Sequence, residues 1–198
     1  MEALDGRILS GGLGDPGREA QRVFRAVLAA LSEPGTVRTI PPVAAPPPPL
    51  SPAMGALALS LCDADTPVFL DPLFAPAAGW LAFHAGAPVT QERAAARFAF
   101  LTVPDLAGFC VGSDTYPDRS ATVVAAASFQ GGPLVLTGPG IRGRTRQVAL
   151  SLEPPVLGAL AANRALYPRG VDLLLVDGDG VMGLPRLVAV GPARGGGG

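Results

Sequence analysis

The segment that most constrains the fold is VDLLLV, residues 171–176. A strand with one face in water alternates apolar and polar residues, whereas a strand covered on both faces is apolar almost throughout. Only Asp172 interrupts this run, so we expect a central strand with a layer of structure on each side. Together with the helical patterns elsewhere in the chain, it predicts an α/β fold, a three-layer α/β/α domain with a mixed sheet.

Helical and strand patterns alternate along the first half of the chain. We expect helices over 15–35, 51–61, 76–83 and 91–96, and strands over 36–40, 68–70 and 98–102. From residue 121, strand follows strand, which favours antiparallel sheet. The expected elements there are strands over 122–126, 134–137, 147–150 and 187–190, a turn over 131–133, a helix over 153–166 and a turn over 177–180. The pattern predicts a single domain over 1–190 and a flexible Gly-rich tail over 191–198.

The clearest local signal is the first long helix. Asp15 is a typical N-cap and Pro16 a typical first residue, and Pro34 with Gly35 ends the pattern. One apolar stripe runs along it at steps of three and four residues: Ala20, Val23, Phe24, Val27, Leu28 and Leu31. The opposite face carries Arg18, Glu19, Arg22 and Arg25.

Composition limits the partners of the chain. Hydrophobic residues make up 48% and charged residues 16%, against roughly 25% charged in an ordinary soluble protein. The apolar surplus favours a partner subunit, and a net charge of −1 gives no reason to expect nucleic acid. Residues 72–91 and 120–141 are uncharged, but their prolines, glycines and polar residues argue against membrane spans. The N-terminus has no secretory signal pattern, so we expect a cytoplasmic protein.

The absence of lysine excludes several kinds of catalysis. All 15 basic residues are arginine, so the chain cannot form a pyridoxal-phosphate aldimine and lacks the lysine of a Walker A loop. One histidine and two cysteines are too few for an ordinary zinc site. We therefore expect no cofactor and no metal.

The best candidate for binding is the segment GGPLVLTGPGIRGRTR, residues 131–146. Glycines that follow a strand let backbone amides approach an anion, and arginines offer forked donors to phosphate or phosphonate. The candidate substrate-binding residues are Gly138, Gly140, Arg142 and Arg144. No helix follows the glycines directly and Pro139 lacks an N–H, so a plain turn between strands is the alternative.

No catalytic residue is predicted. His84 has no acidic partner close in sequence, and the alternative to a general base is a histidine that satisfies backbone groups at a helix end. The pairs Asp63 with Asp65 and Asp177 with Asp179 fit turns better than metal sites. Ser113, Ser120 and Ser128 lie in no nucleophile motif, and Cys62 and Cys110 are expected to be buried thiols.

Seven segments, taken together and in order, resemble the PhnH family, the H subunits of the bacterial carbon–phosphorus lyase system. They are GREAQRVFRAVLAALSEPG (17–35), LCDADTPVFL (61–70), LAFHAGAP (81–88), SATVV (120–124), GGPLVLTGPGI (131–141), YPRGVDLLLV (167–176) and LPR (184–186). The proline run 46–49 and the Gly-rich tail depart from the family pattern, and both fall in expected loops.

The resemblance implies a fold like a reduced pyridoxal-phosphate transferase without its chemistry. It also implies a subunit of the lyase core complex with G, I and J partners, and a homodimer when isolated. That complex supports formation of ribose 1-phosphonate 5-triphosphate from ATP and a phosphonate, with the iron–sulfur radical step in J. The resemblance assigns no catalytic residue to H.

Three hypotheses about function follow. The first is an assembly subunit without independent activity, whose apolar surface docks a partner. The second is a phosphonate- or nucleotide-binding enzyme subunit that uses the arginine-rich segment around Arg142 and Arg144. The third is a small-molecule-binding relic of the transferase fold.

Overall fold

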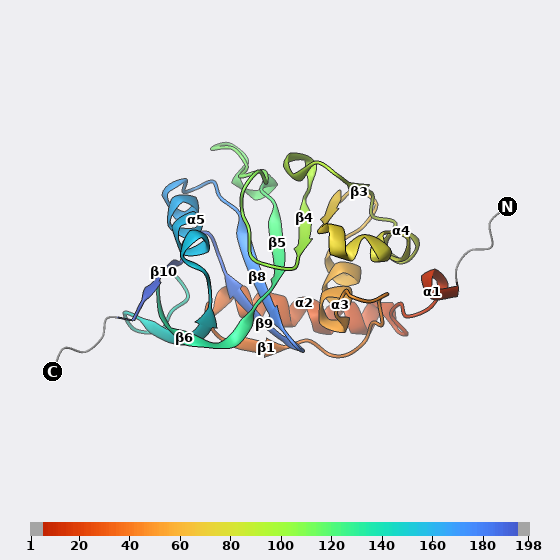
Figure 1. Ribbon diagram of the computed structural model, residues 1–198, viewed down its shortest axis with the longest axis horizontal. Coiled ribbons are helices and arrows are strands. Elements are labelled where there is room, and N and C mark those ends of the chain that lie inside the picture. The colour runs from red at the N-terminus through yellow and green to blue at the C-terminus, as the bar shows by residue number, and fades with distance from the viewer. Residues whose placement is uncertain (1–5, 194–198) are drawn as a thin grey trace.

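A computed structural model describes residues 6–193 of the chain (Figure 1). Its α-helices are α1 (Gly6–Leu9), α2 (Pro16–Ser32), α3 (Pro52–Leu61), α4 (Ala78–Ala85) and α5 (Pro154–Ala165). Short 3₁₀ helices span Pro72–Ala77 (η1), Arg93–Ala95 (η2) and Pro117–Arg119 (η3). The strands are β1 (Val37–Thr39), β2 (Val68–Leu70), β3 (Val89–Thr90), β4 (Phe98–Leu101), β5 (Thr122–Ala126), β6 (Ser128–Thr137), β7 (Arg146–Ser151), β8 (Asp172–Asp177), β9 (Gly180–Leu184) and β10 (Ala189–Pro192).

A seven-stranded mixed sheet forms the centre of the fold, in the order β1-β9-β8-β5-β4-β2-β3. The strands from β3 to β8 in this order are mutually parallel, and β9 and β1 are antiparallel to their neighbours. β8 lies between β5 and β9, and Leu173, Leu174 and Leu175 are each at most 1% exposed. The prediction of a central strand covered on both faces is confirmed.

The two faces of this sheet are covered by different layers. Val124, Leu174 and Val181 face a core formed with α2, α3 and α4, which contains Trp80 and Leu57. The strand residues that point the other way pack against α5 and a second sheet. That sheet is antiparallel with the order β10-β6-β7, so the outer layer on this side combines a helix with three strands. The α/β class is confirmed, and the second sheet is a feature that the sequence did not predict.

The helices begin where capping residues predict. The Asp15 side chain accepts a hydrogen bond from the Arg18 amide at the start of α2, and Ser51 does the same for the Met54 amide at the start of α3. α2 packs so closely on β9 that a Cβ at Gly183 would lie 2.6 Å from the Ala30 carbonyl oxygen. A glycine is therefore required where the helix crosses the strand.

The predicted turn over 131–133 is wrong. β6 runs through it without interruption, with an irregularity in its pairing to β7 between Ser128 and Pro133. A Cβ at Gly131 would lie 2.2 Å from the Ser151 amide nitrogen, so this glycine permits close approach of the two strands instead of reversing the chain. β5 and β6 consequently belong to different sheets and do not form a hairpin.

The sequence pattern missed strands β3 and β9, and it placed β10 two residues too early in the chain. β3 has only two residues, and β9 contains glycines at both 180 and 183, which weakens a strand pattern. The strand expected over 187–190 is β10, which continues to Pro192, so the first residues of the predicted tail belong to the second sheet. Residues 194–198 of that tail lie outside the described residues.

The two uncharged stretches form parts of the core. Residues 72–91 contain η1, α4 and β3, and residues 120–141 contain β5 and β6. Among the described residues, no helix has the length and apolar character needed to cross a bilayer.

Candidate functional site

The predicted binding segment forms the loop between β6 and β7. Gly138 and Gly140 have φ values of +138° and +79°, and a Cβ at Gly140 would lie 2.4 Å from the Ser32 carbonyl oxygen. Ile141 is buried beside them. Gly140 lets the loop pack on the C-terminal end of α2, and a Cβ at Gly138 would lie 3.0 Å from the Leu187 carbonyl oxygen. This close packing matches the turn alternative better than an anion cradle.

The two candidate arginines of this loop have free side chains. Arg142 and Arg144 are exposed, and neither makes a hydrogen bond or ion pair with any residue from 6 to 193. A cavity of about 530 Å³ lies beside them, lined by Thr137, Thr145, Gln147 and strand β10. Thr137 precedes Gly138 and Thr145 follows Arg144, so the loop borders the cavity although the arginines do not line it.

His84 holds a backbone group in place. It lies in the last turn of α4, and its Nε2 is 3.2 Å from the Ser10 carbonyl oxygen, which also accepts from Trp80 Nε1 at 2.9 Å. Its ring packs between Trp80 and Phe83, with centroids 5.2 and 4.9 Å away. This is the arrangement that the structural alternative for His84 predicts.

Asp63 organises a local turn, whereas Asp177 at the end of β8 holds a backbone amide of β6. Asp63 Oδ1 accepts hydrogen bonds from the Asp65 amide and the Thr66 hydroxyl, and Asp177 Oδ2 accepts from the Phe129 amide. Within residues 6–193, no three histidine, cysteine, aspartate or glutamate side chains gather as a metal site would require.

Within the described residues, neither cysteine has a contact that would activate it as a nucleophile. Both are free thiols. Burial, and secondarily the charge of Asp63, raises the pKa of the Cys62 thiol to about 12, which suppresses the reactive thiolate. Cys110 is half-buried, and its Sγ lies 3.6 Å from the Arg119 carbonyl oxygen.

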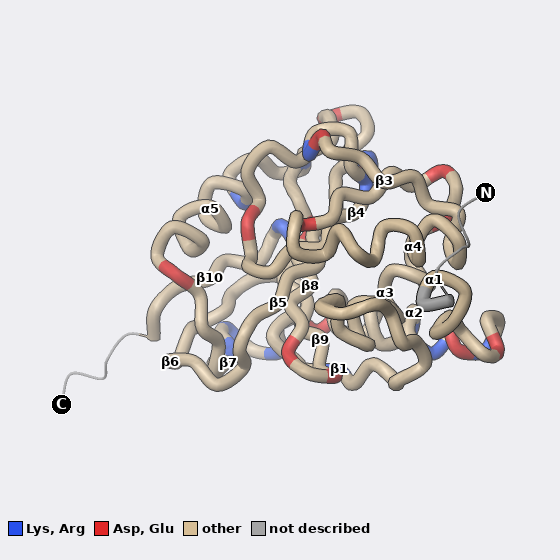
Figure 2. The backbone as a smooth tube through the Cα atoms, turned by 45° about the vertical axis from the view of Figure 1, so that its right-hand side comes forward, with Lys and Arg blue, Asp and Glu red and all other residues tan. Residues whose placement is uncertain are grey.

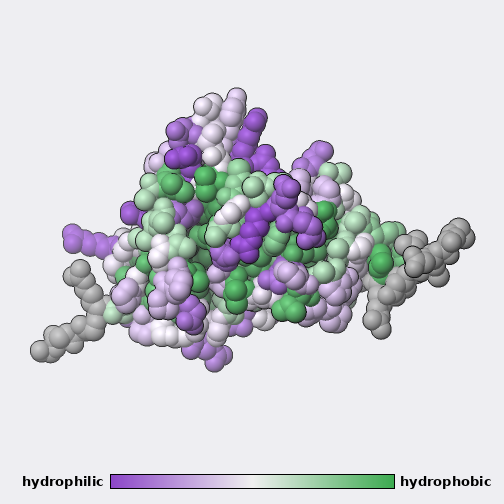
Figure 3. Space-filling view, turned by 45° about the horizontal axis from the view of Figure 1, so that its top comes forward, coloured by the Kyte–Doolittle hydropathy of each residue, from purple (hydrophilic) through white to green (hydrophobic). Residues whose placement is uncertain are grey.

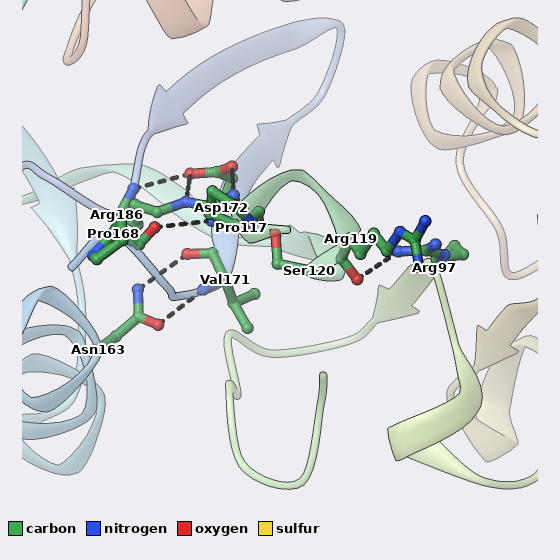
Figure 4. Close-up of polar contacts among 9 residues, drawn as sticks. All are labelled: Arg97, Pro117, Arg119, Ser120, Asn163, Pro168, Val171, Asp172 and Arg186. Carbon is green, nitrogen blue, oxygen red and sulfur yellow. Dashed lines mark hydrogen bonds and ion pairs between the residues drawn. The ribbon is translucent and has the colours of Figure 1, made fainter. Parts of the chain in front are cut away.

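The most highly connected polar cluster was missed by the sequence reasoning. It lies at the amino ends of β5 and β8 and is centred on Arg186 (Figure 4). Nε of Arg186 donates to Asp172 Oδ1 and Nη2 to Asp172 Oδ2 and Ser120 Oγ, while Nη1 donates to the carbonyl oxygens of Pro117 and Pro168. We call this set of five residues the arginine clasp.

The clasp leaves Arg186 no donor for a ligand. A guanidinium has five N–H groups, and the five contacts above use all of them. The side chains of Arg186 and Asp172 are only 15% and 24% exposed. The clasp therefore joins the segment after β9 to β8, to η3 and to the turn after α5, and its role is structural.

Neighbouring contacts strengthen the same edge. Asn163 on α5 accepts from the Val171 amide at 2.8 Å and donates to the Val171 carbonyl at 2.9 Å, as Figure 4 shows. Arg97 donates to the Arg119 carbonyl, and the Arg119 guanidinium lies 4.1 Å from the Tyr116 ring centroid. Sequence spacing gave no signal for the clasp, because Arg186 and Pro117 are 69 positions apart, or for the contact of Arg97 with Arg119, which are 22 positions apart.

Comparison with known proteins places the chain in a family. The family model described as bacterial phosphonate metabolism protein (PhnH) matches residues 11–191. The alpha-D-ribose 1-methylphosphonate 5-triphosphate synthase subunit PhnH of Rhizobium meliloti (strain 1021) is 44% identical over 188 residues, which cover 91% of this chain and 94% of the relative. A putative C-P lyase subunit protein, HtxG of Stutzerimonas stutzeri, is 41% identical over 78 residues, 38% of this chain and 40% of the relative. The resemblance seen in the seven sequence segments is confirmed, and the chain belongs to the PhnH family of bacterial phosphonate metabolism proteins.

Proposed function

We propose that this chain is a subunit of a ribose 1-methylphosphonate 5-triphosphate synthase and serves organophosphonate breakdown in a carbon–phosphorus lyase core complex. The observation that carries the proposal is the 44% identity to a synthase subunit over 91% of the chain. Its partners in the proposal are the G, I and J subunits, and its contribution is assembly instead of independent catalysis. It works in the cytoplasm.

The surface of α2 supports an assembly role. The fold buries Val23 and Val27 from the apolar stripe, but Phe24 and Leu28 remain 46% and 51% exposed. Because these two residues lie one turn apart, they present a joint apolar surface. The apolar stripe is wider than the part that packs on the core, so Phe24 and Leu28 remain available to a partner.

Charge around this surface limits the partner. Arg22 and Arg25 are exposed on α2 and make no ion pair within residues 6–193. Figure 2 shows how few charged positions the chain carries, and Figure 3 shows apolar side chains reaching the surface between hydrophilic ones. A partner surface with apolar residues and an acidic margin would match α2 in both respects.

Co-purification tests the assembly role. The tagged chain, expressed with the other lyase subunits of its own organism, should retain G, I and J. Phe24→Gln with Leu28→Gln should lower that retention at least tenfold, because glutamine keeps the helix and removes the apolar contact. Arg18→Gln, on the charged face of the same helix, is the matched control and should retain the partners.

Growth provides the functional readout. Cells that lack their own H subunit should use methylphosphonate as sole phosphorus source only when this chain is supplied. A chain that never retains a partner and never restores growth would contradict the proposal. In isolation we expect a homodimer, which sedimentation velocity would detect as a species of twice 20.0 kDa.

A second candidate is anion binding at the β6–β7 loop. The unpartnered guanidinium groups of Arg142 and Arg144 beside a cavity with two threonine hydroxyls favour it. Calorimetric titration of ATP and of methylphosphonate into the chain should give saturable heats that Arg142→Ala with Arg144→Ala abolishes. Heats that are absent, or identical in the double variant, would rule it out.

A further inference from the structure

The carboxyl edge of the large sheet contains a crevice that no part of the proposed function uses. β4 and β5 lie side by side in the middle of the sheet (Figure 1). A cavity of about 450 Å³ and another of about 330 Å³ lie over their carboxyl ends. Both are lined by Thr102, Ala126 and Ala127, so the two cavities adjoin at these three small side chains, and we call the pair the crevice.

The topology makes this edge a natural binding position. The chain leaves β2 through η1 and α4, which pack on one face of the sheet. It leaves β4 through a loop whose Leu106 and Phe109 pack on the other face. Adjacent parallel strands whose connections leave to opposite faces open a crevice at their carboxyl ends, where α/β proteins bind ligands. The cavity of about 330 Å³ reaches this point between β2 and β4, since Leu73, Phe74 and Thr102 line it. Asp71 after β2 and Thr102 after β4 meet there, with a hydrogen bond of 2.9 Å from the threonine hydroxyl.

Among the described residues that line the two cavities, the charged side chains are the carboxylates of Asp177 and Glu153, which accept hydrogen bonds. Asp177 Oδ2 accepts from the Phe129 amide, whereas Oδ1 has no partner in residues 6–193. Glu153 precedes α5 but its side chain does not cap the helix. The Thr102 hydroxyl already donates to Asp71 and so can only accept from a ligand. The side chains that line the two cavities include no arginine or histidine.

The start of α5 is unsuited to anions. A helix N-terminus usually offers free amides to a phosphate or carboxylate. Here Pro154 and Pro155 have no N–H, and the Val156 amide donates to the Glu153 carbonyl at 2.9 Å. The crevice therefore disfavours the anions that the β6–β7 loop would attract.

The crevice also offers apolar contact. Met54 and Phe74 line one of the two cavities and Val156 lines the other. Leu73 and Val103 lie at its margin, 63% and 64% exposed. Burying such exposed apolar side chains under a ligand is favourable, because it removes their surface from water.

We propose that this crevice binds a small molecule with an apolar body and a positively charged amine. The body would contact Phe74, Leu73 and Val103, and the amine would donate to Asp177 and Glu153. The site is separate from the apolar surface of α2, so it can fail while the assembly role holds.

The probe is tryptamine, with indole-3-acetate as the ligand of matched shape and opposite charge. We expect tryptamine to cause saturable shifts in the amide NMR signals of Ala126, Ala127 and Phe129, and indole-3-acetate to cause none. Equal binding of the two, or shifts by neither tryptamine nor the related tyramine and benzylamine, would overturn the proposal.

Two variants locate the binding. Asp177→Asn with Glu153→Gln keeps both shapes and should weaken tryptamine about threefold to fivefold per lost charge, the range of a partly exposed ion pair. Asp65→Asn, in a turn before β2, removes one charge from the opposite edge and should change nothing. Val103→Arg places a positive charge at an exposed margin without burying it, and should abolish binding while circular dichroism and partner retention stay normal. Unchanged tryptamine affinity in Val103→Arg would place the ligand elsewhere.

Discussion

The two edges of the large sheet are built in opposite ways. At the amino edge the arginine clasp uses all five donors of Arg186, and Asn163 pairs with both backbone groups of Val171. At the carboxyl edge Asp177 keeps a free oxygen, the Glu153 side chain does not cap α5, and Ala126 and Ala127 line both cavities. A cluster rich in charged side chains can therefore be purely structural, and unused hydrogen-bonding capacity is the better sign of a binding site.

The largest expected effect comes from breaking the clasp. Arg186→Ala leaves Asp172 with an unpaired charge in a mostly buried position, a change that costs about 3–5 kcal/mol of unfolding free energy. Arg186→Lys keeps the charge but cannot reproduce five donors in one plane, so it should recover only part of the loss. Chemical denaturation measures both. A loss below about 1 kcal/mol for Arg186→Ala would show that the clasp is not structural.

Asn163 should show the next effect. Asn163→Ala removes two hydrogen bonds in a side chain that is 7% exposed and leaves the Val171 amide and carbonyl without partners. The expected loss is about 2–3 kcal/mol, since unsatisfied buried groups bear their full desolvation cost. Asn163→Asp keeps the acceptor for the amide but places an unpaired carboxylate beside the Val171 carbonyl oxygen, so at neutral pH its melting temperature should be no higher than that of the alanine variant.

Asp71, at the carboxyl edge, should make the free energy of unfolding depend on pH. Burial raises the pKa of its carboxyl, but hydrogen bonds from the Leu73 amide and from Thr102 outweigh that effect and hold the pKa below the ordinary 3.8. The charged form therefore stabilises the folded chain above pH 3.8, and this contribution is lost as pH falls through the lower folded pKa. Asparagine caps a helix about as well as aspartate, so Asp71→Asn tests the charge: it should cost about 1 kcal/mol at neutral pH through weakened hydrogen bonds to the carboxylate, and the difference should vanish well below pH 3.8. A difference that persists unchanged in acid would contradict this account.

The smallest effect on stability is expected at the crevice margin. Val103 is 64% exposed, so Val103→Ser should change the unfolding free energy by less than about 0.5 kcal/mol. Thermal unfolding would check this beside Arg186→Ala. A large loss would mean that the margin of the crevice is part of the core, and that the two edges are less different than their contacts indicate.

The features that were predicted correctly are those that depend on neighbouring residues in the sequence. Asp15 and Ser51 marked their helices, and the apolar run at 171–176 marked the central strand. The sequence could not place Gly131, because a glycine in a turn and a glycine under a close neighbouring strand have the same pattern. The clasp and the crevice depend on residues far apart in the chain, so only the fold reveals them.

The candidate site was predicted less well than the fold. Arg142 and Arg144 are free as a binding role requires, but Gly140 packs on the end of α2 and Gly138 packs against Leu187. Their residue types suggested an anion site because glycine and arginine are common in such sites. The same types also suit a tightly packed loop, and the sequence has no feature that separates the two.

Gly183 links the packing of the core to the position of the exposed face of α2. Since the backbone of α2 rests against β9 at this glycine, the height of the helix above the sheet sets where Phe24 and Leu28 project. An alanine at this position would push the helix, and with it the exposed Phe24 and Leu28, away from the sheet. In the proposed assembly, the position of a partner on α2 would therefore depend on a glycine that is buried beneath the helix.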